Sequence, residues 1–125
     1  MSFKNILVPY DNSEHAKNAL KEAIGLSEGV EGVAIHVVEV AAPPQESDHK
    51  LQDEIVSIVE GFEGELTAEV VFGIYTIETI IDAAKHYDCD LIVMGSRGLG
   101  AIRGAIGSVS YGILRSVDIP VLVVK

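Results

Sequence analysis

The chain has 125 residues, of which 48% are hydrophobic, and a formal net charge of −10 at pH 7. This length suits one domain, so we expect residues 1–125 to form a single folding unit. Its apolar runs are shorter than the roughly 20 residues of a membrane span, and its start lacks the pattern of a signal peptide. We therefore predict a cytoplasmic protein with no membrane partner. The acidity also disfavours nucleic acid, whose phosphate backbone requires a basic surface.

The charges are unevenly distributed. Residues 1–90 have a net charge of −13, whereas residues 91–125 have +3. This difference is either a consequence of acidic, solvated helices in the first part or a sign that the second part meets an anionic ligand. The single cysteine, Cys89, excludes an internal disulfide and a CxxC site, and its place before a strand favours a buried role.

Buried strands and amphipathic helices are expected to alternate along the chain. An apolar run that ends at a proline predicts a strand over residues 4–9, and Asn12 or Ser13 can cap a helix over residues 13–27. β-branched residues predict a second strand over 33–38, in which we expect His36 to be a satisfied strand histidine. Helical spacing of apolar residues predicts a helix over 47–61 with a solvated acidic face.

The second half continues in the same way. We predict a strand over 66–72, a helix that Thr76 caps, a strand over 90–94, a helix over 108–117 and a strand over 120–124. Alternating strands and helices of this length indicate right-handed βαβ units. The predicted fold is therefore α/β, a single doubly wound domain with a five-stranded parallel sheet and helices on both faces. Such sheets bind ligands at the carboxyl ends of strands, where the strand order reverses.

Two of these strand ends carry distinctive residues. Asp11 follows the first strand, where its carboxylate can bind a hydroxyl or amino group of a ligand, or act as a helix N-cap. Residues 95–110, GSRGLGAIRGAIGSVS, contain five glycines before serines that open a helix. Glycine allows close backbone approach and helix N-termini favour phosphate, so this segment has the composition of an anion-binding loop. Tight turns with a serine N-cap are the alternative explanation.

These residues resemble the universal stress protein family. Its nucleotide-binding members carry, after a strand ending in Met-Gly, the pattern Gly, two residues, Gly, nine residues, then Gly-Ser or Gly-Thr. This chain has MGSRG at 94–98 and GSVS at 107–110. The opening ILVPYDNSE at 6–14 and the closing IPVLVVK at 119–125 are also similar to the family's first and last strands. The resemblance covers the whole chain, with three motifs in the expected order.

The resemblance implies a Rossmann-like fold of the adenine nucleotide alpha hydrolase type and a regulatory module that binds ATP. Pro9 and Asp11 would line the adenosine side, and the backbone at Val37 would contact the adenine. Met94 would pack nearby. The ribose and phosphates would be bound by Gly95, Gly98, Gly107, Ser108 and Val109. AMP or ADP in place of ATP, and an accompanying Mg²⁺ or Mn²⁺ ion, stay open.

The resemblance also implies a homodimer, because relatives pair their last strand across a two-fold axis. In this chain that strand lies between Pro120 and Val124, and its apolar residues would form an edge that invites association. A nucleotide-free module of the same fold that acts through this dimer surface is the alternative function.

The chain departs from the family pattern at two places. Eight residues, 99–106, separate Gly98 from Gly107, where the family has nine. One missing residue shifts backbone N–H groups by up to about 3.5 Å, so ATP is expected to bind more weakly unless Gly100 and Gly104 let the loop re-form. The second departure is Tyr75, where relatives often have a small residue or proline. Its ring could stack on a base or plug the pocket.

Other function classes fit the sequence less well. Residues 98–104 mimic a dinucleotide fingerprint, but no later strand ends in an acid for the ribose. A receiver domain would need an aspartate at the end of the third strand, which ends in Phe72-Gly73. We assign no catalytic or metal-binding residues, and expect at most a slow ATPase, since the glycine-rich loop has no lysine. The histidines at 15, 49 and 86 are expected to be solvated.

Overall fold

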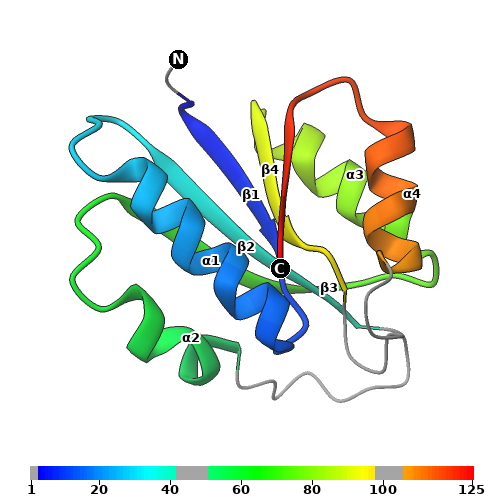
Figure 1. Cartoon of the computed structure of the whole chain (residues 1–125), viewed down its shortest axis with the longest axis horizontal. Helices are drawn as coiled ribbons and strands as arrows, with labels where there is room; N and C mark the ends of the chain where they lie inside the picture. The colour runs from blue at the N-terminus through cyan, green and yellow to red at the C-terminus, as the bar shows by residue number, and fades with distance from the viewer. Residues whose placement is uncertain (1–2, 42–50, 98–105) are drawn as a thin grey trace.

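The computed structural model describes residues 3–41, 51–97 and 106–125. Its centre is a five-stranded parallel sheet with strand order β3-β2-β1-β4-β5 (Figure 1). The strands are β1 (Asn5–Pro9), β2 (Ala34–Ala41), β3 (Glu65–Phe72), β4 (Leu91–Gly95) and β5 (Val121–Val124). The helices are α1 (Glu14–Ser27), α2 (Leu51–Val59), α3 (Thr76–His86) and α4 (Ser108–Ser116). The predicted α/β class and five-stranded parallel sheet are confirmed.

The sheet separates two apolar cores because successive side chains of a strand point to opposite faces. Ile6 and Val8 of β1 belong to the core beneath α1 and α2, whereas Leu7 between them belongs to the core beneath α3 and α4. Figure 1 shows the two helix pairs on opposite sides of the strands. The doubly wound arrangement thus follows from the near-continuous apolar runs of the central strands, which are buried on both faces.

Two predicted helix starts can be compared with the observed ones. Ser13 is the N-cap of α1, as expected, and its hydroxyl accepts from the Ala16 N–H at 3.2 Å. The prediction that Thr76 caps α3 is wrong, because Thr76 is the first helical residue and Tyr75 is the N-cap, without a side-chain cap bond. The Tyr75 carbonyl instead accepts from both the N–H and the hydroxyl of Thr79. Residues 47–50 of the predicted second helix lie outside the described residues.

The order of the strands reverses between β1 and β4. These two strands are paired at the centre of the sheet, with Ile6 opposite Leu91 and Leu7 opposite Ile92. The chain leaves β1 for α1 on one face and leaves β4 for α4 on the other, so the segments that follow the two strands diverge. In parallel sheets this divergence opens a crevice at the carboxyl edge. We call this place the switch point.

Cys89 is buried, as predicted. Burial, followed by the charges of Asp90 and Asp88, raises the pKa of its thiol to about 12. The thiol therefore stays protonated at neutral pH, and a protonated thiol is a poor nucleophile. In the part of the chain that the structure describes, none of the helices combines the length and apolar character that crossing a membrane requires.

His36 is a satisfied strand histidine, as expected. Its side chain is only 6% exposed, and its Nδ1 lies 2.8 Å from the Thr67 hydroxyl. Its ring stacks on that of Tyr87, with centroids 4.1 Å apart, and the Tyr87 hydroxyl donates to Glu69. Burial lowers the pKa of His36, helped by His86 and partly opposed by Glu65 and Glu69. The native fold therefore favours the neutral ring.

This burial predicts that acid destabilises the protein partly through His36. In the unfolded chain the ring protonates below about pH 6.5, whereas in the folded chain its pKa is lower, so protons favour unfolding. The stabilisation is fully present above that pH and is lost as the pH falls toward the folded pKa. Between about pH 7.5 and about pH 5.5, the free energy of unfolding should fall more for the wild type than for His36→Gln, which cannot titrate. Urea denaturation at the two pH values measures this difference. Equal losses would contradict the assignment.

Candidate functional site

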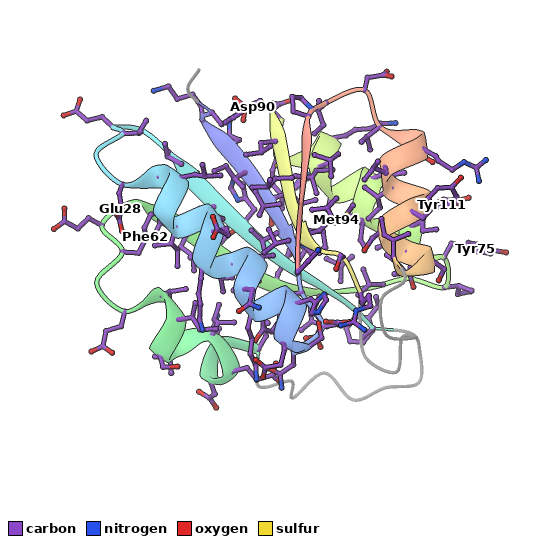
Figure 2. All side chains as sticks on the ribbon, viewed as in Figure 1. Glu28, Phe62, Tyr75, Asp90, Met94 and Tyr111 are labelled. Atoms are coloured by element: carbon purple, nitrogen blue, oxygen red, sulfur yellow. The ribbon has the colours of Figure 1, made fainter. Side chains whose placement is uncertain are left out.

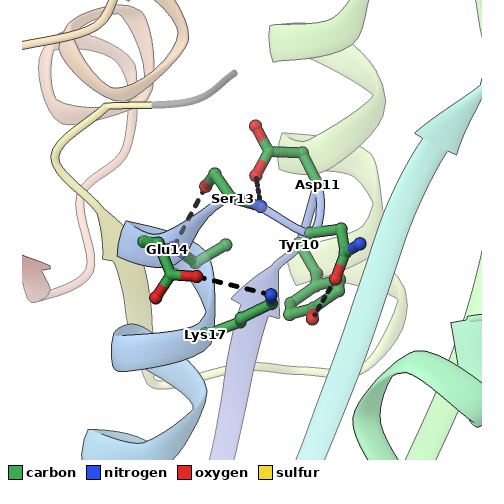
Figure 3. Close-up of polar contacts among 7 residues, drawn as sticks. Tyr10, Asp11, Ser13, Glu14 and Lys17 are labelled. Carbon is green, nitrogen blue, oxygen red and sulfur yellow. Dashed lines mark hydrogen bonds and ion pairs between the residues drawn. The ribbon is translucent and has the colours of Figure 1, made fainter.

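The turn after β1 is organised by its own side chains (Figure 3). The Tyr10 N–H donates to the Val38 carbonyl at 2.9 Å, which ties the turn to β2. The Tyr10 hydroxyl donates to Asn12 Oδ1 at 2.9 Å, and Asn12 has a positive φ of 62°, which asparagine tolerates well. The Asp11 carboxylate accepts from the Ser13 N–H at 3.1 Å. Asp11 is thus held in a defined position at the carboxyl edge of β1.

Tyr10 lies beneath this turn and is 4% exposed. Its burial raises the pKa of the phenol to about 12, and the charges of Glu54 and Glu39 add to the shift. The hydroxyl consequently remains a hydrogen-bond donor at physiological pH and keeps Asn12 in place. The turn therefore does not depend on a ligand for its shape.

Gly95, the last residue of β4, supports the first turn of α1. A Cβ atom at Gly95 would lie 2.8 Å from both the carbonyl carbon and the Cβ of His15, and 3.0 Å from the Ala16 nitrogen. Real Cβ atoms essentially never come this close to backbone, so any larger residue would push α1 away from β4. The N-terminal turn of α1 and the end of β4 are therefore in direct contact because position 95 is a glycine.

The start of α4 is tied to the end of β4 by two hydrogen bonds. The Ser110 hydroxyl donates to the Gly95 carbonyl, and the Gly107 N–H donates to the Ser96 carbonyl, both at 2.6 Å. Gly107 is the N-cap of α4 and makes no side-chain cap bond. The first N–H groups of a helix have no intrahelical acceptor, and here that of Gly107 is taken by Ser96, so those of Ser108 and Val109 are the candidates for an anion at this edge. The side chains of these two residues are exposed.

A histidine connects the two sides of the switch point. His15 Nδ1 lies 2.8 Å from the Ser96 hydroxyl oxygen, and His15 Nε2 lies 2.9 Å from Arg97 Nη2. His15 belongs to the first turn of α1, whereas Ser96 and Arg97 directly follow β4. The expectation that His15 is solvated is therefore wrong, since its ring is partly buried between these two residues. His86 is exposed, as expected.

The structure brings most of the predicted site residues to one edge of the sheet. Pro9 ends β1, and Asp11 follows it, next to the strand that ends in Met94 and Gly95. Gly107, Ser108 and Val109 reach this edge through the two bonds from α4 to β4. Gly98, and the loop of residues 99–105 with its shortened spacing, lie outside the described residues. The expected contacts with a nucleotide stay predictions.

The side chains of three residues do not face a ligand at the carboxyl edge. Met94 is 2% exposed, points into the core beneath α3 and α4, and lies inside the molecule in Figure 2. Val37 is wholly buried within β2, between Val8 and Ala68, so its side chain belongs to the core. Tyr75 is 68% exposed and its ring points away from the sheet (Figure 2). The interpretation that Tyr75 plugs the pocket is wrong.

Sequence reasoning missed His15 and Ser96. The position of His15 indicates its partial burial, because His15 precedes Ala19 by one helical turn. Ala19 lies on the buried face of α1 and is completely buried. The buried stripe of α1 therefore continues toward the N-terminus through position 15. Ser96 has no such signal, because it lies among the glycines of residues 95–110 and nothing in the local pattern distinguishes its hydroxyl.

Comparison with known proteins identifies the family of this chain. The model of the universal stress protein family matches residues 2–125. The chain belongs to the universal stress protein family. It is 30% identical to universal stress protein MJ0531 of Methanocaldococcus jannaschii over 141 residues, which cover 98% of this chain and 82% of the relative.

Solved structures of universal stress proteins have the same fold. The structure of the hypothetical protein MJ0577 superposes with a TM-score of 0.83 at 27% identity, covering 100% of this chain and 97% of the other. A universal stress protein in complex with cAMP superposes with a TM-score of 0.79 at 20% identity, covering 100% and 98% of the two chains. The strand order and helix layers described above are therefore those of this family.

The contact at Gly95 predicts the effect of a minimal substitution in this universal stress protein. Gly95→Ala should lower the unfolding free energy by about 1–3 kcal/mol, because the new methyl group overlaps the backbone of α1. Gly25→Ala is the matched control within α1, since nothing lies within 4 Å of a Cβ there. The control should be about 0.5–1 kcal/mol more stable, owing to the helix propensity of alanine. Chemical denaturation measures both, and equal stabilities would contradict the close contact.

Proposed function

We propose that this universal stress protein is a regulatory module that binds an adenine nucleotide at the switch point, with ATP as the first ligand to test. The observation that carries the proposal is the attachment of α4 to β4 through Ser110 and Gly107. This attachment puts the N-terminus of α4, with N–H groups that lack intrahelical acceptors and with its positive dipole end, at the same edge as the turn of Asp11. The N-terminus of α4 can then bind an anionic group of a ligand, while Asp11, on the other side, binds a hydroxyl group of the same ligand.

The proposed contacts follow from these positions. Pro9 and Asp11 line the adenosine side, where the carboxylate accepts from a ribose hydroxyl while it also accepts from the Ser13 N–H. The backbone at Val37 contacts the adenine. The N–H groups that open α4, together with the backbone of Gly95 and Gly98, bind the phosphates. Support for an adenine ligand comes from the fold shared with the universal stress protein in complex with cAMP.

A binding role fits these residues better than a metabolic reaction. Residues 95–110 contain no lysine that could stabilise a transferred phosphoryl group as in Walker-type sites. Among the described residues, no three or more His, Cys, Asp or Glu side chains are grouped so that they could hold a metal ion. An accompanying Mg²⁺ or Mn²⁺ ion would therefore depend mainly on the phosphates, as Mg²⁺ does in many nucleotide sites. In a cytoplasmic regulator, the nucleotide would serve as a signal.

Two substitutions should separate the adenosine contacts from the phosphate contacts. Asp11→Ala should weaken adenosine and ATP alike, by roughly tenfold to a hundredfold, because both carry the ribose that the carboxylate binds. Gly107→Val should weaken ATP much more than adenosine, because its side chain fills space next to the phosphates. Isothermal titration calorimetry measures all four affinities.

The controls exclude trivial losses of binding. Gly107 has φ −71° and ψ 156°, which any residue can adopt, so the valine causes no backbone strain. Asp11→Asn keeps an oxygen for the Ser13 N–H and should preserve the turn while removing the charge. If both test variants bind ATP as tightly as the wild type, the site is wrongly placed.

The second candidate function, a nucleotide-free dimeric module, is favoured by the outer edge of β5. Among the described residues this strand pairs only with β4, and its four residues, VLVV, carry no charge. Leu122 is 37% exposed at this edge. An unpaired apolar strand edge is a template for pairing with a second copy. We propose a homodimer through the strand between Pro120 and Val124, with or without nucleotide.

Sedimentation equilibrium tests the dimer. The wild type should have twice the monomer mass at micromolar concentration, and Leu122→Lys should shift it toward the monomer, because a buried, unpaired lysine opposes edge pairing. Val56→Lys is a suitable control, since Val56 is also exposed but lies on α2 (Leu51–Val59), which packs beside β3 at the opposite edge of the sheet. A monomeric wild type would refute the dimer without affecting the nucleotide proposal.

A further inference from the structure

The hydrogen bonds of His15 determine where its proton lies. Arg97 can only donate, because a guanidinium has no acceptor and stays charged in proteins. His15 Nε2, 2.9 Å from Arg97 Nη2, must therefore be the acceptor and carry no proton. The proton of the neutral ring is then on Nδ1, which donates to the Ser96 hydroxyl at 2.8 Å. Ser96 and His15 together form a short chain of hydrogen bonds that ends at the guanidinium.

This chain crosses the switch point. His15 follows the turn after β1, and Arg97 follows β4, so the bond between them joins the two segments that diverge on opposite faces of the sheet. Gly95 makes the crossing short, because it lets the backbone of His15 lie against the end of β4. The guanidinium is thereby placed at the carboxyl edge where the opening turn of α4 is attached to Ser96.

The His15 ring is a neutral partner in this bond, so this contact adds no negative charge beside the positively charged guanidinium. A carboxylate in the position of His15 would have offset that charge. The first turn of α1 adds its own positive dipole end, and Glu14, the acidic residue in that turn, is exposed and lies 3.5 Å from Lys17. The two facing segments therefore bring the guanidinium of Arg97 and the N-terminus of α4 to one edge, whereas the N-terminus of α1 is capped by Ser13 and has the Asp11 carboxylate beside it.

We infer that His15 is a positioning residue, which with Ser96 orients Arg97 to bind the phosphate groups of the ligand. The inference deepens the proposed function and rests on it, since it assumes that a nucleotide occupies the switch point. Arg97 makes the site selective for phosphorylated over unphosphorylated adenine ligands, and His15 acts through Arg97 without touching the ligand. The quantity that reports on both residues is the ratio of ATP affinity to adenosine affinity.

The experiment is a double-mutant cycle in the full chain, with calorimetric titration of adenosine, AMP and ATP. Arg97→Gln should lower the ratio by roughly tenfold to a hundredfold, as expected for a lost charge-assisted bond. His15→Leu should lower it by roughly threefold to tenfold, because the arginine keeps its charge but loses its orientation. The double variant should be no worse than Arg97→Gln alone, since His15 has no effect without the arginine.

Two further variants distinguish positioning from a general structural role. His15→Gln can accept from Arg97 through its carbonyl oxygen and donate to Ser96 through its amide, so it should restore most of the ratio. His86→Gln changes an exposed histidine at the far end of α3 and should leave the ratio unchanged. Nitrogen NMR of the His15 ring should show the proton on Nδ1 in the wild type and a changed signal in Arg97→Gln.

Different results would refute the proposed function and the inference about His15. A wild type that binds neither adenosine nor ATP refutes the proposed function, and the role of Arg97 in phosphate binding with it. A wild type that binds ATP while His15→Leu keeps the full ratio refutes the inference alone. Additive losses in the double variant, or a proton on Nε2 of His15, would likewise show that His15 does not act through Arg97.

Discussion

The site depends on one steric constraint, the absence of a side chain at position 95. Gly95 lets the first turn of α1 rest on the end of β4, and this contact sets the distance between the two segments that leave the centre of the sheet. Its carbonyl also accepts from Ser110, which brings α4 to the same point. One residue thus fixes two helix N-termini against one strand end. The polar groups at the carboxyl edge owe their common location to this packing.

The side chains around that contact are joined by hydrogen bonds on both sides of the switch point. Asp11 and Ser13 complete the turn after β1 and start α1, so hydrogen bonds within the chain hold the backbone on this side. His15 and Ser96 join this side to Arg97 by hydrogen bonds that leave the arginine charged. A preordered site loses less conformational entropy on binding than a loop that must fold around its ligand. The described residues therefore form a rigid frame for the proposed nucleotide.

Much of the fold could be predicted because its signals are local. The apolar runs of the central strands and the Ser13 cap can be recognised within a few residues, and β1, α1 and β4 formed close to the predicted bounds. Long-range features were harder. The role of His15 depends on residues 81 and 82 positions away, and no local pattern encodes that contact. Thr76 failed as a cap for a related reason, since good capping chemistry at one residue does not exclude a helix start one residue earlier.

The separation of these partners along the chain also has a consequence for folding. β1 and β4 are adjacent in the sheet, yet α1, β2, α2, β3 and α3 lie between them in sequence. Contacts across such separations form slowly, because the loop entropy must be overcome before they stabilise the chain. The two sides of the switch point cannot meet in a molecule whose β4 has not yet docked beside β1. The contacts of His15 with Arg97 and of Ser110 with Gly95 therefore form only in completely folded molecules, and the proposed ligand would find its whole site only there.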